Sequence, residues 1–154
     1  MGLSDFLSPS RIMLGLGGCK RRELIGRLAE QFAEDLGGDA SAYAQPLIAR
    51  EKLGSTAIGK GIALPHGKAE CLSRPAAVAA VLRSPVNFQD PDGVEVDVVI
   101  AFLSPDGPPK DLDRLASIVR ELRRDEVRQA FRIANTPDGI AKLITALRGD
   151  RRSL

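Results

Sequence analysis

Apolar residues recur every three or four positions in five stretches of the chain, which is the spacing that places them on one face of a helix. Two of these stretches lie in the first third of the chain, at residues 24–36 and 39–54. The first ends at a glycine pair, and Asp39 or Ser41 is the expected cap of the second. Pro46 lies inside the second helix, so we expect a kink or a late start there.

Three more helices are predicted in the last third of the chain, at residues 112–122, 127–134 and 136–149. Thr136 is the expected cap of the last helix, with a proline in its first turn, and Gly149 is its expected end. The face of this helix that we expect to be buried carries Ile140, Leu143, Ile144 and Leu147.

Four shorter apolar runs are strand candidates, at residues 11–16, 62–64, 76–82 and 94–103. The last run is nearly continuous in valine, isoleucine and phenylalanine, which is typical of a strand buried on both faces. A strand, two helices, several strands and three helices, in that order, predict an α/β layered domain.

Length and composition narrow the class of protein. The 154 residues fit one domain, expected at residues 1–148 and followed by a frayed tail at 149–154. A net charge of +2 and an aromatic content of 4% without tryptophan make a poor surface for nucleic acid. The longest apolar runs are far below the ~20 residues that cross a bilayer, so we expect no membrane insertion. Cys19 and Cys71 lack metal-type neighbours and are too few for a disulfide scaffold, which favours the cytoplasm and no bound metal.

The single histidine, His66, follows a proline at the end of a glycine-rich segment, residues 55–67. A neutral imidazole, with an ordinary pKa of ~6.5, offers a lone pair that serves as base, metal ligand or nucleophile. Because glycine adopts positive φ freely, we expect successive N–H groups, helped by hydroxyl donors, to converge on an anion beside the imidazole. The candidate phosphate-loop residues are Ser55, Thr56, Gly59, Gly61 and Gly67.

The alternative is that these glycines are turn residues with no ligand. Their spacing matches neither the Walker A loop nor the dinucleotide-binding pattern Gly-x-Gly-x-x-Gly, so no nucleotide cofactor is expected.

The chain from Arg50 onward reads Arg-Glu-Lys-Leu-Gly-Ser-Thr-Ala-Ile-Gly-Lys-Gly-Ile-Ala-Leu-Pro-His-Gly-Lys. This segment resembles the signature of the fructose/mannitol-type (type-2) enzyme IIA domain of the bacterial phosphoenolpyruvate-dependent phosphotransferase system. Its opening Arg-Glu-Lys-Leu-Gly-Ser-Thr and its closing Pro-His-Gly-Lys look most like the nitrogen-regulatory branch. The resemblance covers nearly the whole chain and implies a three-layer α/β/α sandwich with a mixed β-sheet.

The resemblance also implies a phosphotransferase without a cofactor, in which His66 accepts a phosphoryl group from a phosphorylated histidine phosphocarrier protein. Arg50 matches the family's active-site arginine, and a guanidinium suits that role because its fork can hold two phosphoryl oxygens. From spacing alone, Arg50 is also compatible with a helix-surface residue paired with Glu51 or another acid. The implied role is mainly that of a nitrogen or metabolic regulator.

Two alternatives to this role stay open. One is a regulatory protein-binding module with weak or lost phosphorylation, and the other is a sugar-transport enzyme IIA that donates to an enzyme IIB. The first is motivated by Asp111, which stands where many members of the resembled family have a second histidine. A carboxylate there repels phosphoryl oxygens unless it is protonated or paired. We favour the interpretation that Asp111 caps the N-terminus of its helix, where an acid is favourable by ~0.3 to 1 kcal/mol.

Overall fold

A mixed sheet of six strands lies at the centre of the computed structural model, which describes residues 2–17 and 19–152. The strands are β1 (Ile12–Leu16), β2 (Ala57–Gly59), β3 (Ile62–Ala63), β4 (His66–Lys68), β5 (Ala76–Val86) and β6 (Val96–Ser104). Along the sheet they follow the order β1-β5-β6-β3-β2, and β4 also pairs with β6. β5 runs antiparallel to β6, whereas β3 and β4 run parallel to β6, and β1 runs parallel to β5.

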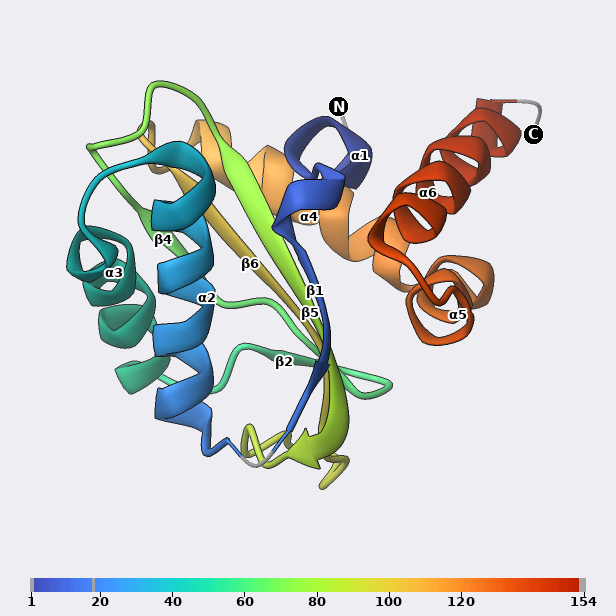
Figure 1. Cartoon of the computed structure of the whole chain (residues 1–154), viewed down its shortest axis with the longest axis horizontal. Coiled ribbons are helices and arrows are strands. Elements are labelled where there is room, and N and C mark those ends of the chain that lie inside the picture. The colour runs from blue at the N-terminus through green and yellow to red at the C-terminus, as the bar shows by residue number, and fades with distance from the viewer. Residues whose placement is uncertain (1, 18, 153–154) are drawn as a thin grey trace.

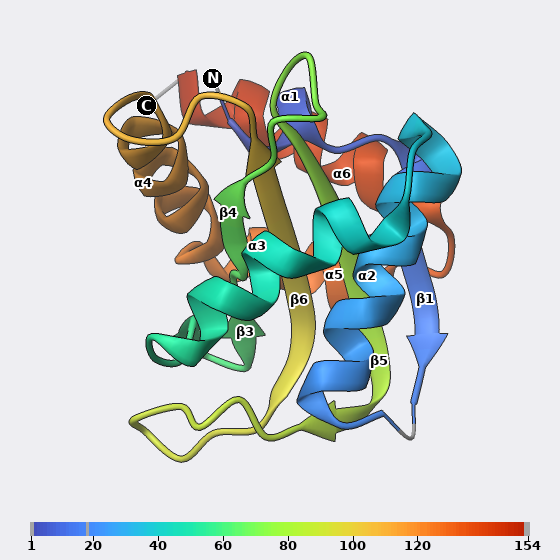
Figure 2. The same cartoon turned by 90° about the vertical axis from the view of Figure 1, so that its left-hand side faces the viewer.

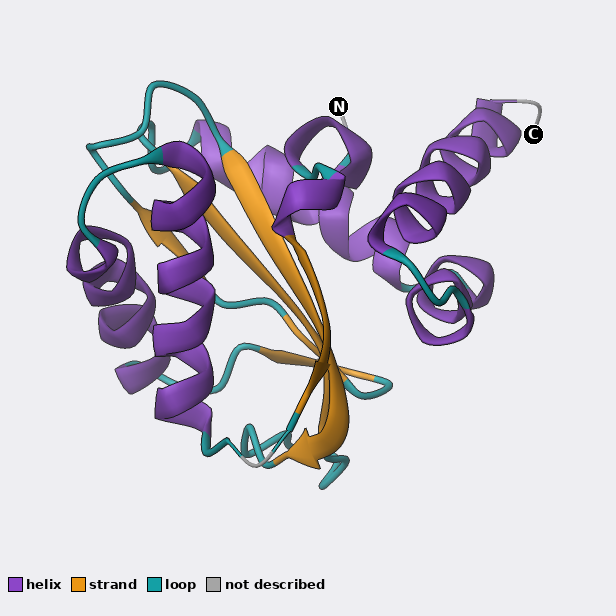
Figure 3. Ribbon diagram, viewed as in Figure 1, coloured by secondary structure: helices purple, strands orange, loops and turns teal. Residues whose placement is uncertain are grey.

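Helices cover both faces of this sheet (Figures 1 and 3). They are α1 (Leu3–Phe6), α2 (Arg21–Leu36), α3 (Ala40–Lys52), α4 (Lys110–Leu122), α5 (Asp125–Ile133) and α6 (Pro137–Arg152), with a 3-10 turn at Pro9–Arg11. α2 and α3 pack on one face, and α1, α4, α5 and α6 pack on the other. The predicted three-layer α/β/α sandwich with a mixed sheet is therefore confirmed.

β6 is the strand on which the two halves of the core meet. It is buried along its length except at half-buried Asp97, as its continuous apolar run predicts. Because side chains of a strand alternate between faces, Val99 and Leu103 join the cluster under α2 and α3. Ile100 and Phe102 join the cluster on the opposite face, under α1 and the C-terminal helices. Both layers of helices are thus held against one strand.

The two predicted helix caps are present. The Asp39 carboxylate accepts the Ser41 N–H at 3.0 Å, and the Thr136 hydroxyl oxygen accepts the Gly139 N–H at 3.0 Å. α3 begins at Ala40, so the late start expected from Pro46 is wrong. Tertiary packing of this proline, described below, offsets the helical hydrogen bond that it cannot donate.

Other predicted boundaries need correction. The first strand begins at Ile12 because the 3-10 turn occupies the preceding residues, and the short strands β2 and β4 were not predicted. α6 continues to Arg152, past its expected end at Gly149, and Leu143 is 43% exposed rather than buried. The predicted frayed tail stays a prediction, and its residues 153–154 lie outside the described residues. Across the helices that the structure describes, none is both long and apolar enough to traverse a bilayer.

The close approach of α3 to β4 depends on Gly67. A Cβ atom built on Gly67 lies 2.9 Å from Pro46 Cβ and 3.1 Å from the Pro46 carbonyl oxygen, which is closer than real side chains pack. A side chain at this position therefore forces the helix and the strand apart.

We expect Gly67→Ala to lower the free energy of unfolding by about 1–3 kcal/mol, the usual cost of overpacking. Urea denaturation measures this change. Gly26→Ala is the matched control, since Gly26 lies inside α2 and the added Cβ meets no atom within 4 Å apart from its chain neighbours and the backbone of its own helix. At this position alanine raises the free energy of unfolding by about 0.5–1 kcal/mol.

A Gly67→Ala protein as stable as the wild type would show that α3 and β4 can move apart without a loss of stability.

Candidate functional site

His66 is the first residue of β4, where it lies beside Phe102 of β6. Its ring is half-buried, and Nδ1 lies 2.8 Å from the carbonyl oxygen of Leu64. A carbonyl oxygen only accepts hydrogen bonds, so in the neutral ring Nδ1 carries the proton and donates it to Leu64. The lone pair of the neutral imidazole is therefore on Nε2.

The surroundings of His66 favour this neutral form. Burial is the largest influence and lowers the pKa of His66 below its ordinary value, and the positive charge of Arg50 lowers it further. The hydrogen bond to Leu64 and the negative charges of Glu51 and Asp111 act in the opposite direction and raise it. The net shift is downward, so a nucleophilic imidazole persists at lower pH than in a free peptide.

Arg50 lies in the last turn of α3, which crosses β4 in Figure 2. The residue is half-buried, and its guanidinium donates from Nη1 to the carbonyl oxygen of Gly54 at 2.9 Å, in an exposed hydrogen bond. This bond uses one of the five N–H donors of the side chain. Because α3 packs on β4 through Pro46 and Gly67, the end of the helix is carried toward His66, whose pKa the guanidinium lowers.

Asp111 is a buried residue in the first turn of α4. Its Oδ2 accepts the Gly107 N–H at 2.9 Å, and its Oδ1 accepts Arg114 Nη1 at 2.8 Å. The carboxylate thus closes the turn that precedes the helix and is paired with a cation. The N-cap residue of α4 is Pro109 and the helix has no side-chain cap hydrogen bond, so the expected cap is absent. Asp111 is an acid of the first turn, where the helix dipole favours a negative charge.

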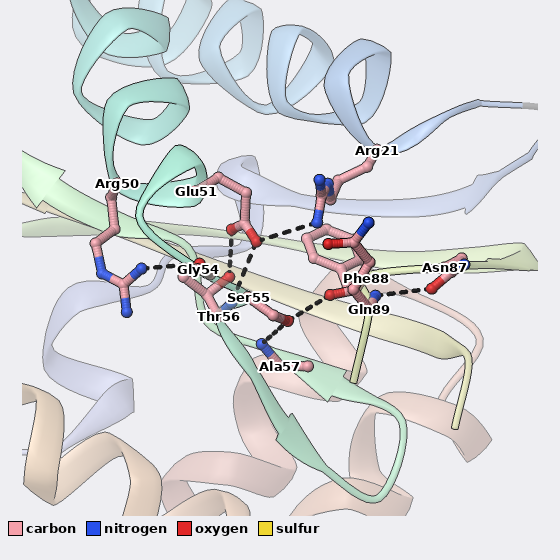
Figure 4. Close-up of polar contacts among 10 residues, drawn as sticks. All are labelled: Arg21, Arg50, Glu51, Gly54, Ser55, Thr56, Ala57, Asn87, Phe88 and Gln89. Atoms are coloured by element: carbon pink, nitrogen blue, oxygen red, sulfur yellow. Dashed lines mark hydrogen bonds and ion pairs between the residues drawn. The ribbon is translucent and has the colours of Figure 1, made fainter. Parts of the chain in front are cut away.

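Ser55 and Thr56 lie between α3 and β2, and both hydroxyl groups already donate to protein acceptors (Figure 4). Thr56 Oγ1 donates to Glu51 Oε1 at 2.5 Å, and Ser55 Oγ donates to the Phe88 carbonyl oxygen. Thr56 is buried, and its own carbonyl oxygen accepts the Leu64 N–H at 2.9 Å. In this arrangement the two hydroxyl groups hold the segment between α3 and β2 in place, and their O–H donors are not available to an anion.

Gly59 and Gly61 lie in the β2–β3 hairpin turn, where both have positive φ, +92° and +80°. Gly61 lies next to Asp97, whose N–H it accepts, whereas His66 lies next to Phe102. Asp97 and Phe102 are five steps apart along β6, which is ~16 Å at the usual rise of a strand. The expectation that their N–H groups converge beside the imidazole is therefore wrong. Gly59 and Gly61 are turn residues, which was the alternative, and Gly67 serves the close packing of α3.

Sequence reasoning missed Glu51 as part of this arrangement. Glu51, one of the acids considered as a partner of Arg50, pairs instead with Arg21 at the start of α2, where Glu51 Oε2 lies 3.7 Å from Arg21 Nη1. The signal was present in the sequence, because Tyr43, Leu47 and Glu51 are spaced by four and share the buried face of α3. An acid on an apolar helix face indicates a buried partner.

Within residues 2–17 and 19–152, no group of three or more histidine, cysteine, aspartate or glutamate side chains is arranged to hold a metal ion.

Comparison with known proteins gives matches over almost the whole chain. Residues 5–146 match the family model described as "Phosphoenolpyruvate-dependent sugar phosphotransferase system, EIIA 2". A nitrogen regulatory protein of Bradyrhizobium diazoefficiens is 34% identical over 145 residues, which are 94% of this chain and 95% of the relative. A nitrogen regulatory protein of Pseudomonas aeruginosa is 32% identical, covering 92% of this chain and 94% of the relative.

Among solved structures, the nitrogen regulatory protein IIA-Ntr of Neisseria meningitidis superposes with a TM-score of 0.83 at 23% sequence identity. The match covers 92% of this chain and 97% of that one. It shows that the two chains share a fold.

We expect the single imidazole to titrate below pH ~6.5, the value of an unperturbed histidine. Since the pKa of the folded state lies below that of the unfolded state, the stability that His66 contributes is complete above pH ~6.5 and is lost as the pH falls through the folded pKa. NMR titration of the ring in the native and the urea-unfolded protein measures both pKa values. The signal belongs to His66, because the chain contains one histidine. A native pKa at or above the unfolded one would show that Glu51 and Asp111 outweigh burial.

Proposed function

The chain belongs to the type-2 EIIA family of the phosphoenolpyruvate-dependent sugar phosphotransferase system, and from this premise we propose that it is a phosphocarrier that is phosphorylated on His66. The donor is a phosphorylated histidine phosphocarrier protein. The observation that carries the proposal is the hydrogen bond between His66 Nδ1 and the Leu64 carbonyl oxygen, since it leaves the Nε2 lone pair for attack on phosphorus.

In the proposed transfer, the Nε2 lone pair of His66 forms the new N–P bond while the N–P bond of the donor histidine breaks. The electron pair of the broken bond returns to the donor ring. His66 keeps its proton on Nδ1, so its ring becomes positively charged as the bond forms, and the Leu64 carbonyl oxygen stabilises that charge through the hydrogen bond.

The transferred group carries negative charge on its three outer oxygens, and stabilising this charge is the main task of a phosphoryl-transfer site. Arg50 is assigned this role because it lies near enough to lower the pKa of His66 and keeps its charge at any working pH. Asp111 opposes the reaction less than an unpaired carboxylate would, since it forms an ion pair with Arg114 and accepts the Gly107 N–H.

We assign the phosphocarrier a regulatory role in nitrogen metabolism. The support is that the two relatives named nitrogen regulatory protein match this chain over nearly their whole length and its own. Donation to an enzyme IIB remains the alternative fate of the phosphoryl group. Incubation of the phosphorylated chain with a purified enzyme IIB distinguishes the two fates, because only donation removes the phosphoryl group from this chain.

Incubation with phosphoenolpyruvate, enzyme I and the histidine phosphocarrier protein should add one acid-labile phosphoryl group to the wild-type chain. Intact-mass spectrometry measures the addition. The control is His66→Ala, which gains nothing because the chain holds no other histidine. If the wild type gains nothing from a donor mixture that phosphorylates another EIIA protein, the chain is a protein-binding module on this fold.

Replacing Arg50 should slow phosphorylation without abolishing it. Removal of one charge-stabilising donor typically costs about 10²–10³ in rate, so we expect a loss of that order for Arg50→Gln in single-turnover transfer. Arg50→Lys should lose less, because a charge remains but the fork that binds two oxygens is gone.

Arg27→Gln is the matched control, since Arg27 is an exposed arginine of α2. An Arg50→Gln protein that accepts phosphate at the wild-type rate would remove Arg50 from the mechanism.

A further inference from the structure

Glu51 is a buried carboxylate at the C-terminal end of α3, with 7% of its surface exposed. A negative charge is unfavourable both in the core and at a helix C-terminus, where the helix dipole is itself negative. Three contacts offset these costs (Figure 4): Oε2 accepts the Thr56 N–H at 3.1 Å, Oε1 accepts the Thr56 hydroxyl at 2.5 Å, and Arg21 lies 3.7 Å away. The carboxylate thus joins α2, α3 and the segment that leads into β2.

From Thr56 a short series of hydrogen bonds leads to the imidazole. The Thr56 carbonyl oxygen accepts the Leu64 N–H at 2.9 Å, and the Leu64 carbonyl oxygen accepts the His66 Nδ1–H at 2.8 Å. The position of Thr56 therefore determines where the Leu64 carbonyl lies. That carbonyl in turn selects the tautomer and the orientation of the ring.

Arg50 depends on the same segment. Its guanidinium donates to the carbonyl oxygen of Gly54, and the Gly54 N–H donates to the main-chain carbonyl of Glu51 at 3.2 Å. On the far side, Ser55 is fixed by its hydroxyl bond to Phe88, a fully buried residue. The side chain of Glu51 holds Thr56 and so completes the fixation of residues 53–56.

We propose that Glu51 is a positioning residue: through Thr56 and Leu64 its buried carboxylate holds His66 with Nδ1 protonated and Nε2 free, and through residues 53–56 it keeps Arg50 in place. Its effect on phosphoryl transfer rests on the proposed function, whereas its effect on the imidazole does not. The orientation of a nucleophile contributes strongly to rate, and a displacement of 1 Å can cost about 10²-fold. Glu51 touches neither phosphoryl group nor donor and acts through these intermediaries.

The test compares Glu51→Gln with Thr56→Val. Glu51→Gln removes the charge and one acceptor of the carboxylate, whereas Thr56→Val keeps the shape and every charge but removes the hydroxyl bond. If Glu51 acts by position rather than by charge, both variants shift the unphosphorylated ring toward a mixture of tautomers. Nitrogen-15 NMR of the single histidine reads this directly, and single-turnover transfer should slow about tenfold or more in both.

Two variants serve as controls. Thr56→Ser restores the hydroxyl and should return both the tautomer and the rate to wild-type values, which a loss of packing alone does not explain. Thr145→Val makes the same chemical change as Thr56→Val on the exposed side of α6, where the hydroxyl donates to Ala141, and should alter neither.

Folded Glu51→Gln and Thr56→Val proteins with the wild-type tautomer and rate would overturn the proposal. A shift of tautomer in a chain that no donor phosphorylates, wild type included, would instead refute the proposed function and support the positioning of the ring by Glu51. If Glu51→Gln does not fold, Thr56→Val decides the question by itself, because it leaves the buried carboxylate and its pairing with Arg21 in place.

Discussion

The contact between Pro46 of α3 and Gly67 of β4 is the constraint on which the candidate site depends. The helix lies so close to the strand that no Cβ fits at Gly67, and this closeness carries the end of α3, with Arg50, toward the imidazole. A helix at an ordinary distance from a strand that carries a side chain would leave the guanidinium and the imidazole farther apart. Proline inside a helix and glycine inside a strand each weaken their own element. Here each of these local losses is offset by the same packing contact.

The pKa of His66 is the result of opposing influences. Burial and Arg50 favour the neutral ring, and Glu51 and Asp111 favour the protonated one. Neither carboxylate lacks a partner: the first is bonded to Thr56 and the second to Gly107 and Arg114. These paired carboxylates fix the backbone segments to which they bond. Their partners also reduce the effect of the two negative charges on the imidazole.

Asp111 is a buried carboxylate whose partners lie on α4 and in the turn before it. Its carboxylate accepts one hydrogen bond from the Gly107 N–H, in the turn before α4, and one from Arg114. Arg114, one turn later on α4, bonds to both Asp111 and Asp106 and holds positive charge at this end of the helix. Two carboxylates and one guanidinium thus determine the charge at this end of α4.

Local pattern was enough to predict most of the helices and the longer strands, whereas the three-layer sandwich with a mixed sheet was expected from the family resemblance. Apolar periodicity located all but the shortest helices, the continuous run of β6 indicated a strand buried on both faces, and Asp39 and Thr136 were identified as caps, because these signals depend on neighbours a few residues away. The proximity of His66 to Arg50 was expected from the resemblance of one segment and not from spacing. The tertiary structure decided what each glycine does: Gly59 and Gly61 turn a hairpin ~16 Å from the ring, whereas Gly67 admits a helix. It also decided that Glu51 is buried and bonded to Thr56, since burial and partners depend on residues distant in the chain.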